Sequence, residues 1–340
     1  MKINPFIRIL FCLALVLVTY SVSAQPGLAG TYWHDGEWFY PVEAEDDTAI
    51  WVNTLSLHEG GGAVPWLKTS KPDVFRFCHK NSHGITICDS VSRTVIDGQD
   101  LMIIYGADKK LENILIRYNG QSRDENYVYS HGFDSILEKD IRTRIKGKYT
   151  IPGTDLTWQI TNDSIMVSGT SPHPVINNST RYSVVWELDF PTPVLSLDNG
   201  NYLYYQFSLN GLDLFEGVLH TEEDGFKWVE KGRFMYHLYK QNQDGTVPGH
   251  WPEASTMILT RGYLGHYPPE VLRYMRNEIY ARKGYRFDDD SLTSFFNQAG
   301  AWYQPSDQQE NVQLSPIEKL NIQLIRFMEK EKKNRRFRSD

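Results

Sequence analysis

Residues 276–287 carry the strongest local folding signals in the chain, and they read Arg276-Asn277-Glu278-Ile279-Tyr280-Ala281-Arg282-Lys283-Gly284-Tyr285-Arg286-Phe287. The segment predicts the last turns of a helix that stops at Gly284, because glycine adopts the left-handed conformation that ends helices. Tyr285 and Phe287 then alternate past Arg286 and are expected to return to the core. Glu278 and Arg282 stand four residues apart, which predicts a helical ion pair worth a few tenths of a kcal/mol.

Three helices are predicted around this segment. The first begins at Pro268-Pro269-Glu270, because proline fits a first helical turn and a carboxylate stabilises its positive end. Its apolar stripe is formed by Leu272, Met275 and Ile279. A second, short helix follows the capping residues 288–290 and carries Leu292, Phe295 and Phe296. The third begins with a capping box of Ser315 and Glu318 and presents Ile317, Leu320, Leu324, Phe327 and Met328.

In their order along the chain, these residues resemble the YARHG domain, a family named for the motif that residues 280–284 occupy here. The similarity covers about a quarter of the chain, at residues 252–255, 275–287, 295–296, 302–303 and 314–322. The resemblance implies a small, mostly helical domain on secreted or surface bacterial proteins, with a role in cell-envelope interaction. Lys283 stands where the motif has histidine. Lysine titrates far higher and is not a ready metal ligand, which argues against proton or metal chemistry at this position.

The polar and aromatic residues of this module allow two interpretations. In the first, Arg276, Asn277, Glu278 and Arg282 make hydrogen bonds that hold the helix against the turn at residues 302–303. In the second, the same polar residues form a binding patch. The candidate binding residues are Arg276, Asn277, Glu278, Tyr280, Arg282, Lys283, Tyr285, Trp302 and Tyr303. We favour the first interpretation, in which these residues stabilise the domain, over the second, in which they bind a partner.

The preceding part of the chain is predicted to be β structure. Short aromatic and β-branched runs alternate with glycine-containing turns, which is typical of antiparallel strands. Residues 25–121 predict a small sandwich or barrel, and residues 147–240 predict seven or eight strands that close a barrel. The second region is only faintly similar to lipocalin-like barrels.

The predicted fold class is therefore a β-rich multidomain protein, with antiparallel small barrel or sandwich domains, followed by a small, mostly α-helical C-terminal domain. The expected division is a signal peptide at 1–24, a β-rich domain at 25–121, a connector with a short helix at 122–146, a barrel-like domain at 147–240, a linker at 241–250, a helical YARHG-like domain at 251–332 and a basic tail at 333–340.

The first 24 residues predict export. Lys2 and Arg8 precede or flank an apolar run at residues 9–18, and small residues follow at 22–24, as in a secretory signal peptide. Removing it leaves 33 basic and 42 acidic residues, a net charge of −9. This acidic balance argues against a nucleic-acid partner. We expect a periplasmic or extracellular protein with no transmembrane segment after cleavage.

Cys78 and Cys88 are expected to form a disulfide. Both lie in predicted strands on either side of a turn at residues 81–84. They are the two cysteines that remain once the predicted signal peptide, which contains Cys12, is removed, and an even number of cysteines in an exported chain favours a bridge. The alternative is metal ligation with His79 or His83, but the usual paired spacing of zinc ligands is absent.

No catalytic motif stands out in the sequence, and no catalytic residue, metal or cofactor is predicted. The first hypothesis for function is an exported cell-envelope protein that acts as a non-enzymatic binding module. Its partner would be a cell-wall or envelope polysaccharide, or an envelope protein. One alternative is a secreted hydrolase of glycans or peptides whose carboxylates are brought together by folding. Another is a small apolar ligand inside the barrel at residues 147–240.

Overall fold

A computed structural model describes residues 27–339 apart from these gaps: 37, 54–62, 81–83, 119–144, 152–153, 162–163, 170–178, 181, 184–192, 198, 210, 224, 226, 242–246, 299–300 and 307–311. The predicted signal peptide and most of the predicted connector lie outside the described residues.

The first β region is a closed antiparallel barrel. Its strands follow one another in sequence order: β1 (Tyr32–His34), β2 (Phe39–Glu45), β3 (Ala49–Val52), β4 (Val64–Lys68), β5 (Val74–Lys80), β6 (Thr86–Ile96), β7 (Gln99–Tyr105) and β8 (Leu111–Arg117). The barrel closes where Trp33 of β1 pairs with Arg117 of β8. Its interior is filled by buried side chains that include Trp33, Ile50 and Met102. The alternative of a sandwich for this region is wrong.

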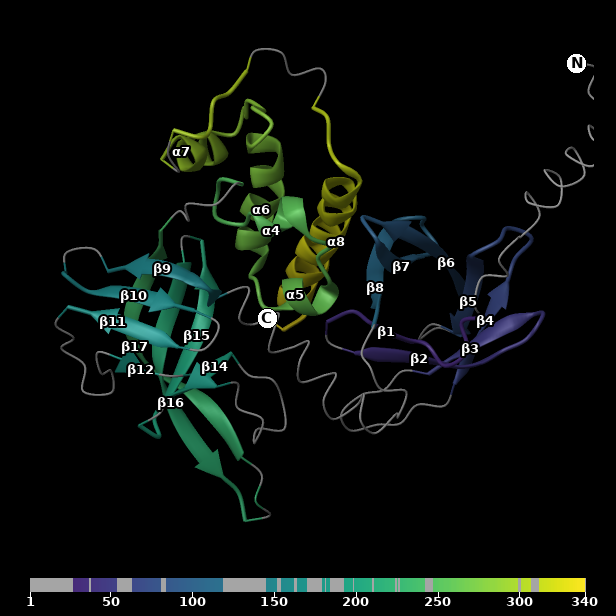
Figure 1. Ribbon diagram of the computed structural model, residues 1–340, viewed down its shortest axis with the longest axis horizontal. Coiled ribbons are helices and arrows are strands. Elements are labelled where there is room, and N and C mark those ends of the chain that lie inside the picture. The colour runs from purple at the N-terminus through teal and green to yellow at the C-terminus, as the bar shows by residue number, and fades with distance from the viewer. Residues whose placement is uncertain are drawn as a thin grey trace, which may run out of the picture.

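Strands β7 and β8 bury both of their faces. Met102 and Leu115 point into the barrel, whereas their neighbours Leu101, Ile103 and Ile114 belong to a second core outside it. Successive side chains of a strand alternate between faces, so a continuous apolar run marks a strand that is covered twice. The outer cover is the C-terminal helical domain (Figure 1).

The second β region forms a nine-stranded antiparallel sheet in the order β12-β11-β10-β9-β17-β16-β15-β14-β13. The strands are β9 (Gly147–Thr150), β10 (Thr157–Ile160), β11 (Ile165–Ser168), β12 (Ser179–Thr180), β13 (Tyr182–Ser183), β14 (Val194–Leu197), β15 (Tyr202–Ser208), β16 (Gly211–Thr221) and β17 (Lys227–Lys240). It is a curled sheet, and Figure 1 shows it on the opposite side of the helices from the barrel.

Strand β17 is longer than the sequence pattern predicts. The pattern predicts two separate strands, at residues 226–229 and 232–239, because the charged pair Glu230-Lys231 and Gly232 interrupt the apolar residues. The structure has one continuous strand of 14 residues. Its pairing with β16 shifts register next to Phe215 and Gly217, and this β-bulge absorbs the irregular residues without ending the strand.

The C-terminal region contains α4 (Glu253–Thr256), α5 (Arg261–Gly265), α6 (Pro269–Ala281), α7 (Asp290–Gln298) and α8 (Pro316–Ser339). The three longer helices begin where the sequence predicted them, whereas α4 and α5 were not predicted. Helix α8 contacts α4, α5, α6 and β8, and it continues through the predicted basic tail as far as Ser339. Within the described residues, no helix is both long enough and apolar enough to cross a membrane.

The hairpin of β5 and β6 contains the predicted disulfide. Cys78 and Cys88 are directly opposite in the strand register, and their sulfurs are bonded. In the chain-entropy model, closing a loop this short stabilises the fold by roughly 2–3 kcal/mol. The disulfide excludes these cysteines as metal ligands.

Candidate functional site

Glu278 is the buried centre of the helical domain. Its side chain has no solvent exposure, yet its carboxylate accepts hydrogen bonds from a segment far upstream. The backbone N–H of Trp251 donates to Oε1 at 2.8 Å, and the backbone N–H of His250 donates to Oε2 at 2.8 Å. The His250 Nδ1 atom lies 3.2 Å from the same Oε2. Glu278 therefore anchors the segment that enters the domain.

Arg282 completes this anchor from the next turn of α6. Its guanidinium pairs with the Glu278 carboxylate, and its side chain is only 5% exposed. Nε donates to the carbonyl of Pro248 at 2.6 Å, and a second nitrogen donates to the Ser255 hydroxyl at 2.9 Å. The pair thus fixes the chain on both sides of residues 249–251.

Gly249 is required by this packing. Its φ of +118° lies in a region that favours glycine, and an added Cβ would lie 2.4 Å from Oε1 of Glu278. No larger side chain fits between the backbone and the buried carboxylate.

The electrostatics of Glu278 differ from those of an exposed helical pair. Burial raises the pKa of its carboxyl, but the charge of Arg282 and the hydrogen bonds from His250 outweigh burial and leave the pKa below its ordinary value. The few tenths of a kcal/mol expected from the sequence for the Glu278–Arg282 ion pair therefore do not apply, because that value describes pairs exposed to solvent. Breaking a buried pair costs several kcal/mol.

Lys283 links the end of α6 to the beginning of α8. The predicted capping box is present: the Ser315 N–H donates to Oε2 of Glu318 at 2.8 Å, and the Glu318 N–H donates to the Ser315 hydroxyl at 3.1 Å. The Lys283 Nζ atom lies 3.2 Å from Oε1 of the same glutamate. The lysine in place of the motif histidine is therefore an ion-pair partner of the capping box.

This contact predicts a pH signature for Lys283→His. A histidine, with an ordinary pKa of about 6.5, pairs with Glu318 only while it is protonated. Since a carboxylate partner raises the folded pKa, the added stability is present at low pH and is lost as the pH rises through that pKa. We expect the variant to lose about 0.5–1 kcal/mol relative to wild type at about pH 8 and to approach wild type at about pH 5.5. Urea denaturation at both pH values measures the difference.

Lys319→His is the matched control, because Lys319 is an exposed lysine in the first turn of α8, next to Glu318. It should show no comparable pH-dependent loss. A stability difference for Lys283→His that is the same at both pH values would contradict the ion pair.

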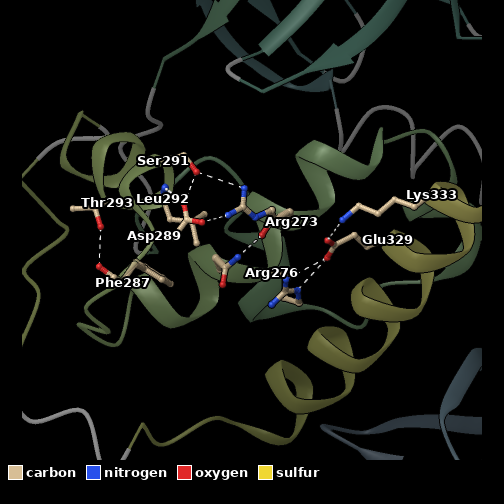
Figure 2. Close-up of polar contacts among 10 residues, drawn as sticks. Arg273, Arg276, Phe287, Asp289, Ser291, Leu292, Thr293, Glu329 and Lys333 are labelled. Carbon is tan, nitrogen blue, oxygen red and sulfur yellow. Dashed lines mark hydrogen bonds and ion pairs between the residues drawn. The ribbon is translucent and has the colours of Figure 1, made fainter. Parts of the chain in front are cut away.

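Arg276 holds α6 to α8, whereas Asn277 makes a hydrogen bond within α6. Two nitrogens of Arg276 donate to Oε2 of Glu329 on α8, both at 3.3 Å, and Lys333 lies 2.8 Å from the other oxygen of that carboxylate. The Asn277 amide donates to the carbonyl of Arg273 at 2.8 Å. Figure 2 shows the contacts of Glu329 with Arg276 and Lys333, together with the ion pair from Arg273 to Asp289, the residue before α7.

The predicted aromatic binding residues form a small core. Tyr280, Tyr285, Trp302 and Tyr303 pack with Phe287 and with two rings of α7, Phe295 and Phe296. At the helix end, the Tyr285 N–H donates to the Tyr280 carbonyl and the Gly284 N–H donates to the Ala281 carbonyl, so the motif glycine closes the helix as predicted. The Tyr303 hydroxyl donates to the Tyr285 carbonyl at 3.0 Å.

The predicted residues thus fall into two sets. The aromatic set holds the turn at residues 302–303, whereas Arg276, Glu278 and Arg282 contact α8 and residues 248–255 rather than that turn. None of the predicted binding residues lines the cleft described next.

A cleft of about 770 Å³ lies where the three parts of the chain meet. The barrel contributes Asp35, Trp38, Tyr40 and Asn113, and β15 contributes Gln206. The helical domain contributes Arg261, Gly265, His266, Tyr267, Pro268, Pro269, Met328, Glu331 and Lys332. Its size falls within the range of small-molecule sites.

Asp35 is the most ordered polar group of this cleft. Its residue is 2% exposed, and its carboxylate accepts from the Trp38 N–H at 2.8 Å, the Tyr40 hydroxyl at 2.9 Å and the Asn113 amide at 2.9 Å. Its backbone carbonyl accepts from the Gly262 N–H of α5 at 2.9 Å. Asp35 therefore organises the cleft wall and also joins the barrel to the helical domain.

Arg261 forms the second joint between these parts. One nitrogen lies 3.0 Å from the Glu331 carboxylate on α8, and another donates to the carbonyl of Glu112 at 3.3 Å. Neither Asp35 nor Arg261 was predicted as a site residue. Their partners are separated by 78 and 149 residues along the chain, and no local pattern encodes such contacts.

No group of three or more histidine, cysteine or acidic side chains that could hold a metal ion occurs among the residues for which the structure gives positions.

These contacts define the C-terminal part as a small helical domain built around a buried glutamate–arginine pair and packed against two β structures. Residues 249–330 match the family model of the YARHG domain, so this part of the chain is a YARHG domain. The match begins at Gly249, the residue that packs against Glu278. Among curated proteins and solved structures, no match to the chain was found.

Proposed function

We propose that this chain is an exported cell-envelope protein that acts as a non-enzymatic binding module. The YARHG domain is often found in exported bacterial proteins, and the Cys78–Cys88 disulfide fits an oxidising compartment. The sequence of residues 1–24 supports the same proposal. The functional division follows the predicted domains, with the β regions at 25–121 and 147–240 and the helical domain at 251–332.

The cleft is the observation that carries this proposal. It has contributions from the barrel, the second sheet and the YARHG domain, and hydrogen bonds between the barrel and the YARHG domain fix two of its walls. Binding sites commonly lie at such domain junctions. In this proposal, the residues of the motif are the scaffold that holds the helical wall of the cleft. Within the segment 276–287, Lys283 and Arg286 are exposed to solvent, whereas the side chain of Arg276 is only 18% exposed.

Hydrolysis is the weaker alternative. Two carboxylates, Asp35 and Glu331, line the cleft, as a glycoside hydrolase requires. However, Asp35 already accepts three hydrogen bonds and Glu331 is paired with Arg261. Both are thus engaged by protein donors, which favours a structural role for them over a role in acid–base chemistry.

A retention experiment tests the proposal. The purified chain is incubated separately with peptidoglycan sacculi, envelope polysaccharide and outer-membrane protein extract immobilised on beads. We expect retention by at least one of these fractions, without release of soluble products. An acidic exported protein of another fold serves as the control for charge. Absence of retention by all three fractions would overturn the proposal, and product release would favour the hydrolase.

A further inference from the structure

We propose that the cleft is one end of a longer groove that binds a linear glycan. This inference rests on the proposed function and names its ligand class and its site. The groove, defined here as the cleft together with the adjoining hollow beside β15, connects the barrel to the second sheet.

The continuity of the groove follows from shared residues. A second hollow of about 240 Å³ is lined by Pro193, Tyr204, Tyr205, Gln206, Phe207, Lys231 and His266. Gln206 and His266 line the cleft as well. The groove therefore passes from β2 of the barrel, beside the turn between α5 and α6, to β15 and β17. An elongated site of this kind suits a chain of repeating units better than a single compact molecule.

Aromatic rings stand along this path. Trp38 and Tyr40 line the barrel end, and Tyr204 lines the far end; all three are half-buried. Their rings combine a large apolar face with a polar edge. A sugar ring has an apolar C–H face that packs on such a ring, while its hydroxyl groups remain at the rim.

The polar groups of the groove match those hydroxyls. A sugar hydroxyl both donates and accepts, so its site needs groups of both kinds. Glu331 supplies acceptor oxygens, Arg261 and Lys231 supply donors, and the amide of Gln206 supplies both. Many of these groups are already oriented by the protein, which lowers the entropy lost on binding.

Lys231 illustrates that preorganisation. Its Nζ atom donates to Oε1 of Gln206 at 3.0 Å and lies 3.9 Å from the centre of the Phe215 ring. Together with the three hydrogen bonds on Asp35 and the pairing of Arg261 with Glu331, it fixes a polar group at each end of the groove.

The charge pattern favours a neutral or weakly charged ligand. The basic residues Arg261, Lys332 and Lys231 and the carboxylates Asp35 and Glu331 line the groove together, and the guanidinium of Arg261 is already paired. A strongly anionic ligand would require a concentrated cationic surface. A peptide would require apolar pockets for alternate side chains, and Met328 is the aliphatic side chain that lines the cleft apart from the two prolines.

The test measures binding of the full-length mature chain to soluble glycans. Calorimetric titration is carried out with hexamers of N-acetylglucosamine, β-1,4-glucose and α-1,4-glucose, and with peptidoglycan glycan strands freed of peptide. We expect at least one of these probes to bind, and Trp38→Ala and Tyr204→Ala each to weaken its affinity by about tenfold or more. Trp51→Ala is the matched control, because Trp51 is 38% exposed on β3 and does not line the groove. Thermal denaturation confirms that each variant folds.

The outcomes separate this inference from the function on which it rests. If an outer-membrane protein fraction or a peptide library retains the chain and no glycan binds, the binding function stands and the glycan inference fails. If a glycan binds equally well to the Trp38 and Tyr204 variants, the groove is the wrong site. If no envelope fraction and no glycan is bound, both proposals fail.

Discussion

Glu278→Ala is expected to lower the free energy of unfolding by about 3–5 kcal/mol, which is the cost of leaving a buried charge without its partner. The substitution strands the guanidinium of Arg282, whose side chain is 5% exposed. It also removes the acceptor for the backbone N–H groups of His250 and Trp251. Residues 248–251 would then lose the hydrogen bonds that hold them to α6. The buried side chain of Trp251 would no longer be fixed in the core of the YARHG domain.

Chemical denaturation followed by tryptophan fluorescence measures this loss, because Trp251 lies beside the substitution. Glu270→Ala is the matched control. It removes the same side chain from the first turn of the same helix, where the residue is exposed, and should cost only about 0.3–1 kcal/mol. A cost for Glu278→Ala no larger than that of the control would contradict the role of the buried pair.

The same carboxylate predicts an acid-dependent loss of stability. Burial raises the pKa of the Glu278 carboxyl, but Arg282 and His250 lower it by a larger amount. The folded pKa therefore lies below the ordinary value of 4.5. A depressed carboxyl pKa contributes stability that is present above the unfolded pKa and disappears as the pH falls through the folded pKa. We expect wild type to lose stability below about pH 4.5 more steeply than Glu278→Gln. Urea midpoints measured from neutral pH into acid provide the comparison, and parallel curves would contradict it.

Asn321→Ala is expected to be the second most damaging single change, with a loss of about 3 kcal/mol. Asn321 lies on α8 with no solvent exposure. Its Oδ1 accepts from the Leu259 N–H at 3.0 Å, and its amide nitrogen donates to the carbonyls of Ala254 at 2.9 Å and Met257 at 2.8 Å. Alanine leaves these buried backbone groups without partners, and each such group costs about 1–3 kcal/mol before relaxation.

Two further variants sharpen this test. Gln323→Ala removes an exposed amide two residues along α8 and should change stability by less than about 0.5 kcal/mol. Asn321→Asp preserves the acceptor oxygen but replaces the donor by a buried charge, so it should be at least as harmful as alanine. A mild effect of Asn321→Asp would show that the two carbonyl contacts contribute little.

Much of the architecture could be predicted because its signals are local. The helix from Pro269, its end at Gly284 and the capping box at Ser315 depend on residues within a few positions of one another. The disulfide depends on a hairpin whose strands have matching patterns. The sequence did not predict strand β4, because Pro65 interrupts its apolar residues and proline is rare inside strands. Helices α4 and α5 were missed because they have only four and five residues.

The sites could not be predicted because their contacts join distant residues. Glu278 had the spacing of an ordinary surface pair with Arg282, and nothing near it in sequence indicated that His250 and Trp251 would cover it. The cleft requires Asp35, Asn113 and Arg261 to meet, which depends on how the barrel docks against α5 and α8. Such docking is set by the shape of complete surfaces rather than by periodicity.

The place of α8 after the barrel strands in the sequence has a consequence for the order of assembly. The barrel closes on itself through β1 and β8, so it presents no open strand edge while the rest of the polypeptide is still being made. The walls of the groove, in contrast, require contacts from Glu331 and Lys332 of α8, which follows the barrel strands in the sequence. The groove is therefore completed only after the barrel strands have been made. In a chain that stops before α8, we expect the barrel strands to keep their closed pairing, the outer face of β7 and β8 to lose part of its cover, and the groove to be absent.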